Sequence, residues 1–267
     1  MLGNTIANTT ELINLTKEEK YQYCMRYLKS LRFVNDCDEE NRTTRLKGVP
    51  KSLVGRIYKD FKDMFSPLGN LLKPFKIPTD WPFVAMIDWH PSTKQAISFM
   101  CVDDLNRDYT IDEVWENMGD EDIADEIIRR KISGWRINDA YIDKLSKGSS
   151  KATQNKWGEE QNSYNIIKER LSNNGITLHE QSRSKDSGIL TIKTKLSAPN
   201  KIPCFFVFDT CARHRWEVKR YIYTDGAYPD TDDHFMQNWY AYALIGLKYT
   251  PLKPKRKKYE YVAAGVA

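Results

Sequence analysis

The stretch FVAMID, which runs from Phe83 to Asp88, is the strongest indication of the fold in this sequence. Five apolar residues without polar alternation predict a strand buried on both faces, and the carboxylate that closes the run is then carried to the rim of a sheet. The same arrangement recurs where Ala140-Tyr141-Ile142 ends in Asp143. Carboxylates from distant chain positions can therefore converge at one edge, where divalent cations bind oxygen ligands.

The segments around FVAMID predict an α/β domain over residues 81–250. Two further strand candidates, at 95–102 and 109–115, follow residues 83–88 after short polar links, so an antiparallel meander is expected. Helices and strands then alternate, which predicts a mixed sheet with helices on both faces. The expected elements are helix 120–131, strand 137–143, helix 161–173, strand 176–180, helix 186–197, strand 204–208 and helices 212–223 and 233–247.

The sequence patterns at the two ends of the chain differ from the pattern of this domain. Residues 1–80 are expected to form an arm or linker, with a helix at 17–36 and an extended connector before Trp81. Residues 251–267 are expected to be a disordered basic tail, which carries five positive charges within six residues while the whole 267-residue chain carries a net charge of +5. This tail has two interpretations, a segment that contacts DNA and a solvated terminus.

The remaining composition points to a soluble intracellular protein. No apolar stretch approaches the ~18 residues that would span a bilayer. Five scattered cysteines favour reduced thiols over a disulfide scaffold. Cys204, Cys211 and His214 lack the spacing of a zinc knuckle and a fourth ligand, so zinc is not expected.

Candidate metal ligands are Asp88, Asp143, Asp232, Asp233 and His234, and Asp88, Asp143 and Asp233 are the preferred catalytic set. Hydrolysis of a phosphodiester requires charge neutralisation by divalent ions, two of which about 3.5–4 Å apart also generate hydroxide. Packed carboxylates repel one another without a cation, so such a cluster is a poor stability device.

Other interpretations of these acids stay open. Asp88 can be a turn residue, and Asp232 or Asp233 can cap the last helix. Asp139 lies four residues before Asp143 on the same strand face and is an alternative to it. Glu113 and Asp209 are reserve candidates, and alternation allows only one of Asp112 and Glu113 to face the cleft.

An ordered set of segments resembles the C-terminal nuclease domain of the large terminase subunit, the DNA-packaging motor of tailed bacteriophages. These segments are GRIYKDF (55–61), PFKIP (74–78) with Trp81, MIDWHP (86–91), YID (141–143), and DDH (232–234) followed by YAL (242–244). The resemblance implies a ribonuclease-H-like fold whose acidic triad binds two Mg²⁺ or Mn²⁺ ions and cuts double-stranded DNA during packaging. It maps the first acid onto Asp88, the second onto Asp143 and the third onto residues 232–233.

The sequence departs from that family in two respects. Many members carry an aspartate three residues after the histidine, where this chain has Gln237, and the subunit's ATPase phosphate loop is missing here. We therefore expect a nuclease piece or a separate nuclease chain that works with a terminase ATPase domain, a small terminase subunit and a portal protein. The implied location is the cytoplasm of the infected bacterium and not the mature virion.

Basic residues that flank the acids in sequence are candidate contacts to DNA phosphates, which position a duplex without reading its bases. A solvated face is the alternative for them. Another ribonuclease-H-like nuclease, of the transposase or resolvase type, is disfavoured because residues 232–247 lack the glutamate that such enzymes usually carry. A non-catalytic DNA- or portal-binding module is the alternative outside enzymes. The basic candidates are Lys147, Lys151, Lys156, Arg183 and Lys185.

Overall fold

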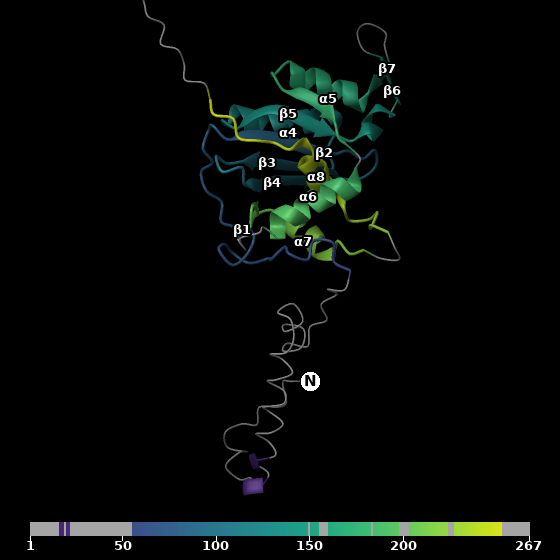
Figure 1. Ribbon diagram of the computed structural model, residues 1–267. Helices are drawn as coiled ribbons and strands as arrows, with labels where there is room; N and C mark the ends of the chain where they lie inside the picture. The colour runs from purple at the N-terminus through teal and green to yellow at the C-terminus, as the bar shows by residue number, and fades with distance from the viewer. Residues whose placement is uncertain are drawn as a thin grey trace, which may run out of the picture.

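The FVAMID stretch lies in the strand β2 (Pro82–Asp88), all seven residues of which are buried in a computed structural model of the chain. Burial on both faces is what a run without polar alternation predicts. β2 lies inside a seven-stranded sheet with the order β1-β9-β4-β3-β2-β5-β8 (Figure 1). The structure describes residues 16–18, 20–21, 55–148, 150–154, 160–182, 184–197, 203–223 and 227–252.

The predicted meander is confirmed. β2 pairs antiparallel with β3 (Gln95–Val102), and β3 pairs antiparallel with β4 (Asp108–Glu116). All eight residues of β3 are buried, whereas the second half of β4 is partly exposed. The meander therefore forms the centre of the sheet and opens toward solvent at the end of β4.

Parallel strands flank the meander on both sides. β5 (Arg136–Ile142) and β8 (Thr177–Glu180) extend the sheet beyond β2, and β9 (Phe205–Phe208) and β1 (Leu71–Leu72) extend it beyond β4. Within the sheet that the structure describes, only β3 runs in the opposite direction. The carboxyl ends of the other strands meet at one edge, the usual place for ligands in such sheets.

Helices lie on both faces of the sheet, which confirms the predicted α/β class (Figure 1). Two consecutive residues of β4 contact helices on opposite faces. The Asp112 carboxylate accepts a hydrogen bond from Arg130 of α4, and the Glu113 carboxylate accepts one from the backbone of His214 in α7. α5 packs beside α4, and α6 and α8 pack together on the face of α7. These helices are α4 (Asp120–Ile132), α5 (Ser163–Ser172), α6 (Lys185–Ser197), α7 (Ala212–Arg220) and α8 (His234–Ile245).

The described residues of the link between β5 and α5 contain secondary structure that the sequence did not predict. In place of a flexible loop and a helix from residue 161, they contain the short 3₁₀ helix η1 (Lys144–Lys147) and a small antiparallel pair, β6 (Ser150–Gln154) with β7 (Glu160–Asn162). The Asn162 side chain accepts a hydrogen bond from the backbone of Asn165 at 2.9 Å. This cap fixes the start of α5 at residue 163.

Part of the predicted arm packs on the domain. Tyr58 and Phe61 are buried and lie 5.8 and 6.0 Å from the Trp239 ring, measured between ring centroids. Leu71 and Leu72 form β1, which pairs with β9. Most of the predicted helix 17–36 and of the tail 251–267 lies outside the described residues. Among the residues that are described, no helix is both long and apolar enough to cross a membrane.

Candidate active site

Asp88 and Asp143 lie side by side at the carboxyl ends of β2 and β5. The two strands are parallel and paired up to Ile87 and Ile142, and the backbone N–H of Asp143 donates to the carbonyl of Ile87 at 3.3 Å. Gln181, which follows β8, donates from its side chain to the same Ile87 carbonyl at 3.0 Å. Both aspartates are therefore held by backbone pairing and by one buried amide.

The first turn of α8 reaches both carboxylates. His234 Nδ1 lies 2.6 Å from Asp88 Oδ2, and the Gln237 amide donates to Asp143 Oδ2 at 3.3 Å. Asp233, the residue before α8, is buried as well. We call Asp88, Asp143 and Asp233 the acidic cluster; it lies at the positive end of the α8 dipole, where negative charge is favoured.

Burial and mutual repulsion both act on the charges of the acidic cluster. Burial raises the pKa of Asp88, and the charges of Asp143 and Asp233 raise it further against the opposing effect of His234. The hydrogen bond between the His234 ring and the Asp88 carboxylate, which accepts it, in turn raises the pKa of His234. The two shifts are coupled, because both side chains take part in the same hydrogen bond.

The residues of the acidic cluster suit hard divalent cations. Asp88, Asp143 and Asp233 are 6%, 5% and 6% exposed, and they offer oxygen ligands, which Mg²⁺ and Mn²⁺ prefer. Their carboxylate oxygens do not all lie within 4.8 Å of one another. That spacing is wider than a single-ion cage requires, but carboxylates that surround two ions about 3.5–4 Å apart need not touch one another.

The alternative acids point elsewhere. Asp232 has a side chain 59% exposed, which accepts a hydrogen bond from Arg213 at 2.8 Å, so the structure separates it from the buried Asp233. Asp139 lies 2.8 Å from Nε2 of His179. Asp209 follows β9, which β4 and β3 separate from β2 in the sheet, and it forms an ion pair with Lys73.

Glu113, Cys211 and His214 form the one group of described residues in which three potential metal-ligand atoms all lie within 4.8 Å of one another, and we call it the closed cluster. His214 Nδ1 donates to Glu113 at 2.6 Å, and its Nε2 lies 3.0 Å from the Ser98 hydroxyl. The order hydroxyl, imidazole, carboxylate matches a nucleophilic triad, but Ser98 and His214 are fully buried, so no substrate reaches them.

Asn238 connects the closed cluster to the strand ends. Its amide donates to the Ser98 hydroxyl at 3.0 Å and to the carbonyl of Ala96 at 3.1 Å, while its oxygen accepts from Gln181 at 3.2 Å. Asn238 and Gln181 are buried and polar, and sequence reasoning did not select them. A polar residue inside the apolar face of a helix was the available signal for Asn238.

The structure describes two of the five candidate DNA-contact side chains. Lys147 forms an ion pair with Glu180 and lies 4.6 Å from the centre of the Tyr164 ring. Lys185 is turned toward Asp233, with its ammonium 3.3 Å from Oδ2. Lys156, Arg183 and the side chain of Lys151 lie outside the described residues.

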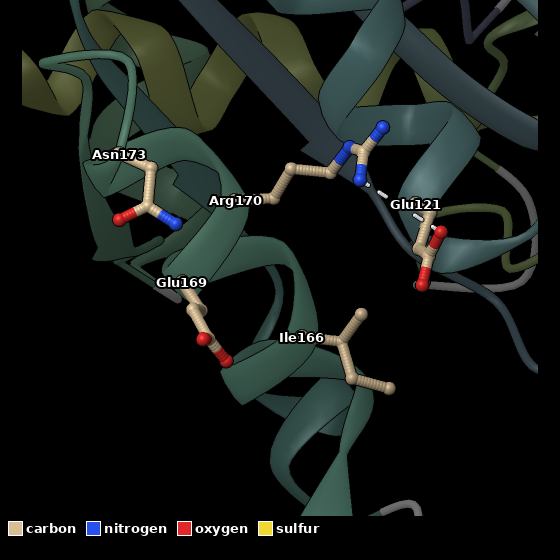
Figure 2. Close-up of a pocket in the computed structure, with 5 residues that line it drawn as sticks. All are labelled: Glu121, Ile166, Glu169, Arg170 and Asn173. Atoms are coloured by element: carbon tan, nitrogen blue, oxygen red, sulfur yellow. Dashed lines mark ion pairs between the residues drawn. The ribbon is translucent and has the colours of Figure 1, made fainter. Parts of the chain in front are cut away.

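A separate hollow lies between α4 and α5 on the opposite side of the sheet. Figure 2 shows Arg170 of α5 extended toward Glu121 of α4, and the atoms of this pair are 3.8 Å apart. Ile166, Glu169 and Asn173 complete the lining. Because the hollow contains no residue of the acidic cluster, it is not part of the candidate active site.

The sheet order and the helices on both faces define a ribonuclease-H-like fold. It is the fold of the phage P22 large terminase nuclease domain, to which this chain is 15% identical with a TM-score of 0.50 over 73% of this chain and 94% of that one. The large terminase of a thermophilic bacteriophage is 13% identical, with a TM-score of 0.53 over 87% of this chain and 52% of that one. The chain thus spans about half the length of this second terminase. No family model and no curated protein sequence matches the chain.

Proposed function

We propose that this chain is a divalent-metal-dependent DNA endonuclease that cleaves viral DNA during genome packaging. The observation that carries the proposal is the acidic cluster, three aspartates whose burial and mutual repulsion raise the pKa of Asp88. The fold shared with phage terminase nuclease domains supports the same proposal. Asp88, Asp143 and Asp233 would hold two Mg²⁺ or Mn²⁺ ions, which would neutralise charge on the scissile phosphate and activate water for the attack.

The chain's own residues orient and balance this site. His234 holds Asp88 in place through a contact of 2.6 Å, and Gln237 holds one oxygen of Asp143. The Asp143 carboxylate also accepts a hydrogen bond from the backbone N–H of Leu145 at 2.7 Å, which fixes its orientation. The positive end of α8 favours an anionic DNA strand beside these residues.

A nicking assay on supercoiled plasmid tests the proposal. Nicking is expected in Mg²⁺ or Mn²⁺, and EDTA should abolish it. Asp88→Asn and Asp143→Asn should each reduce nicking to background, because an amide is a poorer ligand for these ions than a carboxylate. Asparagine retains an oxygen that can accept the hydrogen bond from Leu145, so the Asp143 variant should keep the local structure.

Asp139→Asn is the matched control. Asp139 lies on β5, four residues before Asp143, but its partner is His179 and it is 42% exposed. This variant should nick plasmid at the wild-type rate. Wild-type nicking by Asp88→Asn would overturn the assignment of the acidic cluster.

A non-catalytic DNA- or portal-binding module is the second candidate. One observation favours it: a neutral amide, Gln237, contacts Asp143 at the position where the resemblance implies a further acid. Such a module would bind DNA equally well with and without Mn²⁺ and would nick none. In the proposed role the partners are double-stranded DNA, a terminase ATPase domain, a small terminase subunit and a portal protein, in the cytoplasm of an infected bacterium.

A further inference from the structure

Lys185 places a positive charge on one member of the acidic cluster. Its ammonium lies 3.3 Å from Oδ2 of Asp233 and 3.4 Å from the carbonyl of Pro229. The side chain of Asp233 is 8% exposed and that of Lys185 is 26% exposed. The pair is therefore largely removed from water, where its attraction is stronger than that of a surface ion pair.

Three tyrosine rings surround the same ammonium. The centres of the Tyr221, Tyr228 and Tyr240 rings lie 5.9, 5.5 and 5.7 Å from Nζ of Lys185. Aromatic faces attract a cation at these distances, and more strongly where water is excluded. The three rings and Asp233 thus surround the ammonium of Lys185, and we call this arrangement the tyrosine seat.

Close packing of two helices brings Lys185 to this seat. A Cβ atom on Gly188 would lie 2.3 Å from the carbonyl oxygen of Tyr240, so only glycine lets α6 approach α8 this closely. Lys185 is the first residue of α6, and Asp233 directly precedes α8. A lysine in the first turn opposes the helix dipole, so helix stability does not explain its position.

We propose that Lys185 is a resident counter-cation, a positioning residue that holds the Asp233 carboxylate and competes with a divalent ion for it. This inference rests on the proposed function, because it assigns Asp233 to the ion-binding cluster. The contact of Asp88 with His234 is to an imidazole, a group that can be neutral, whereas the contact of Asp233 with Lys185 is to an ammonium. Cation binding at Asp233 is consequently weaker than the three carboxylates alone would give.

Titration calorimetry with Mn²⁺ on the metal-free protein, without DNA, tests this competition. Lys185→Met fills the tyrosine seat without a charge and should bind Mn²⁺ at least roughly tenfold more tightly, since it removes one positive charge a few ångströms from the ion. Lys185→Arg keeps the charge and should bind Mn²⁺ like the wild type. If the lysine had only a structural role, Lys185→Met would leave Mn²⁺ binding unchanged or weaken it, and would not make it tighter.

Lys195→Met is the matched control on the same helix. Lys195 is 27% exposed, pairs with buried Asp108 at 2.6 Å and lies 6.0 Å from the Tyr242 ring, but it is remote from the acidic cluster in the sheet. Its Mn²⁺ affinity should equal that of the wild type. Thermal melting without metal verifies that each variant is folded, and Lys185→Gln replaces Lys185→Met if the latter does not fold.

A double-mutant cycle separates failure of this inference from failure of the proposed function. In the Asp233→Asn background, which lacks the carboxylate that the lysine and the ion compete for, Lys185→Met should raise the Mn²⁺ affinity by a smaller factor than it does in the wild type. Unchanged or weaker Mn²⁺ binding by Lys185→Met alone would overturn the counter-cation, while loss of binding in Asp88→Asn would keep the proposed function. If Lys185→Met weakens DNA binding and leaves Mn²⁺ affinity alone, the lysine is a phosphate contact. Absence of Mn²⁺ binding by the wild type would overturn both.

Discussion

The closed cluster and the acidic cluster lie on the same face of the sheet and differ in how their charges are satisfied. Glu113 accepts three hydrogen bonds, from the backbone of Arg213 and from the backbone and ring of His214. Burial alone would raise the pKa of Glu113, but these bonds together lower it. Asp88 has one such contact among the described residues, with His234, and its pKa is raised.

Close spacing of potential ligand atoms is therefore a poor guide to a metal site. The atoms of the closed cluster lie within 4.8 Å of one another, yet its carboxylate and imidazole are already paired inside the protein. Burial also raises the pKa of Cys211, so the thiolate that a metal requires is disfavoured. The acidic cluster is more open but keeps charge that a cation would neutralise.

Removal of His214 should produce the largest effect on stability. His214→Ala leaves Glu113 buried without its imidazole partner and removes the partner of Ser98, at a cost of about 3 kcal/mol in the free energy of unfolding. Urea unfolding measures this loss. The folded variant should bind Mn²⁺ like the wild type; a lost Mn²⁺ affinity with full stability would instead make the closed cluster a metal site.

Glu217 links the two clusters and should give an intermediate, pH-dependent effect. It accepts hydrogen bonds from the backbone of Phe235 in α8 and from Arg213 in α7, yet burial outweighs these and raises its pKa to about 7. The unfolded chain releases this proton near pH 4.5 and the folded chain near pH 7, so stability falls as pH rises between these values.

Glu217→Gln removes that titration. The wild type should lose about 2 kcal/mol in the free energy of unfolding between pH 5 and pH 7 that the variant does not lose. Urea unfolding at several pH values compares the two proteins. Parallel pH profiles would show that Glu217 is charged in the folded protein at low pH, contrary to the effect of burial.

Gln237→Glu should produce the smallest effect. The change places a negatively charged oxygen beside Asp143 where an amide now donates at 3.3 Å, so the acidic cluster should bind Mn²⁺ roughly tenfold more tightly, or about 1.4 kcal/mol. Gln237→Met is the neutral control of similar length. Calorimetry decides, and equal affinity in the two variants would indicate that residue 237 does not act on the bound ion.

Much of the fold followed from local patterns. The strands at 83–88, 95–102 and 109–115 and the later helices were predicted within a few residues, because apolar runs, polar links and caps are short-range signals. The packing of residues 55–80 against the domain was not predicted. The prolines and turn formers of this segment indicated a connector, while its few apolar residues, including Tyr58 and Phe61, pack on a distant helix.

Local sequence was enough to predict a carboxylate at the end of β2 and another directly after β5, because strand periodicity and strand ends are set by neighbouring residues. The packing of α8 distinguishes Asp233 from Asp232 as the acid that is buried. Asp232 adopts a left-handed backbone with φ of 54°, which turns its side chain to Arg213 and leaves Asp233 buried. The partners of these acids lie far away along the chain: 146 residues separate His234 from Asp88 and 48 separate Lys185 from Asp233. No local pattern encodes such contacts, because they exist only once the sheet and its helices have packed.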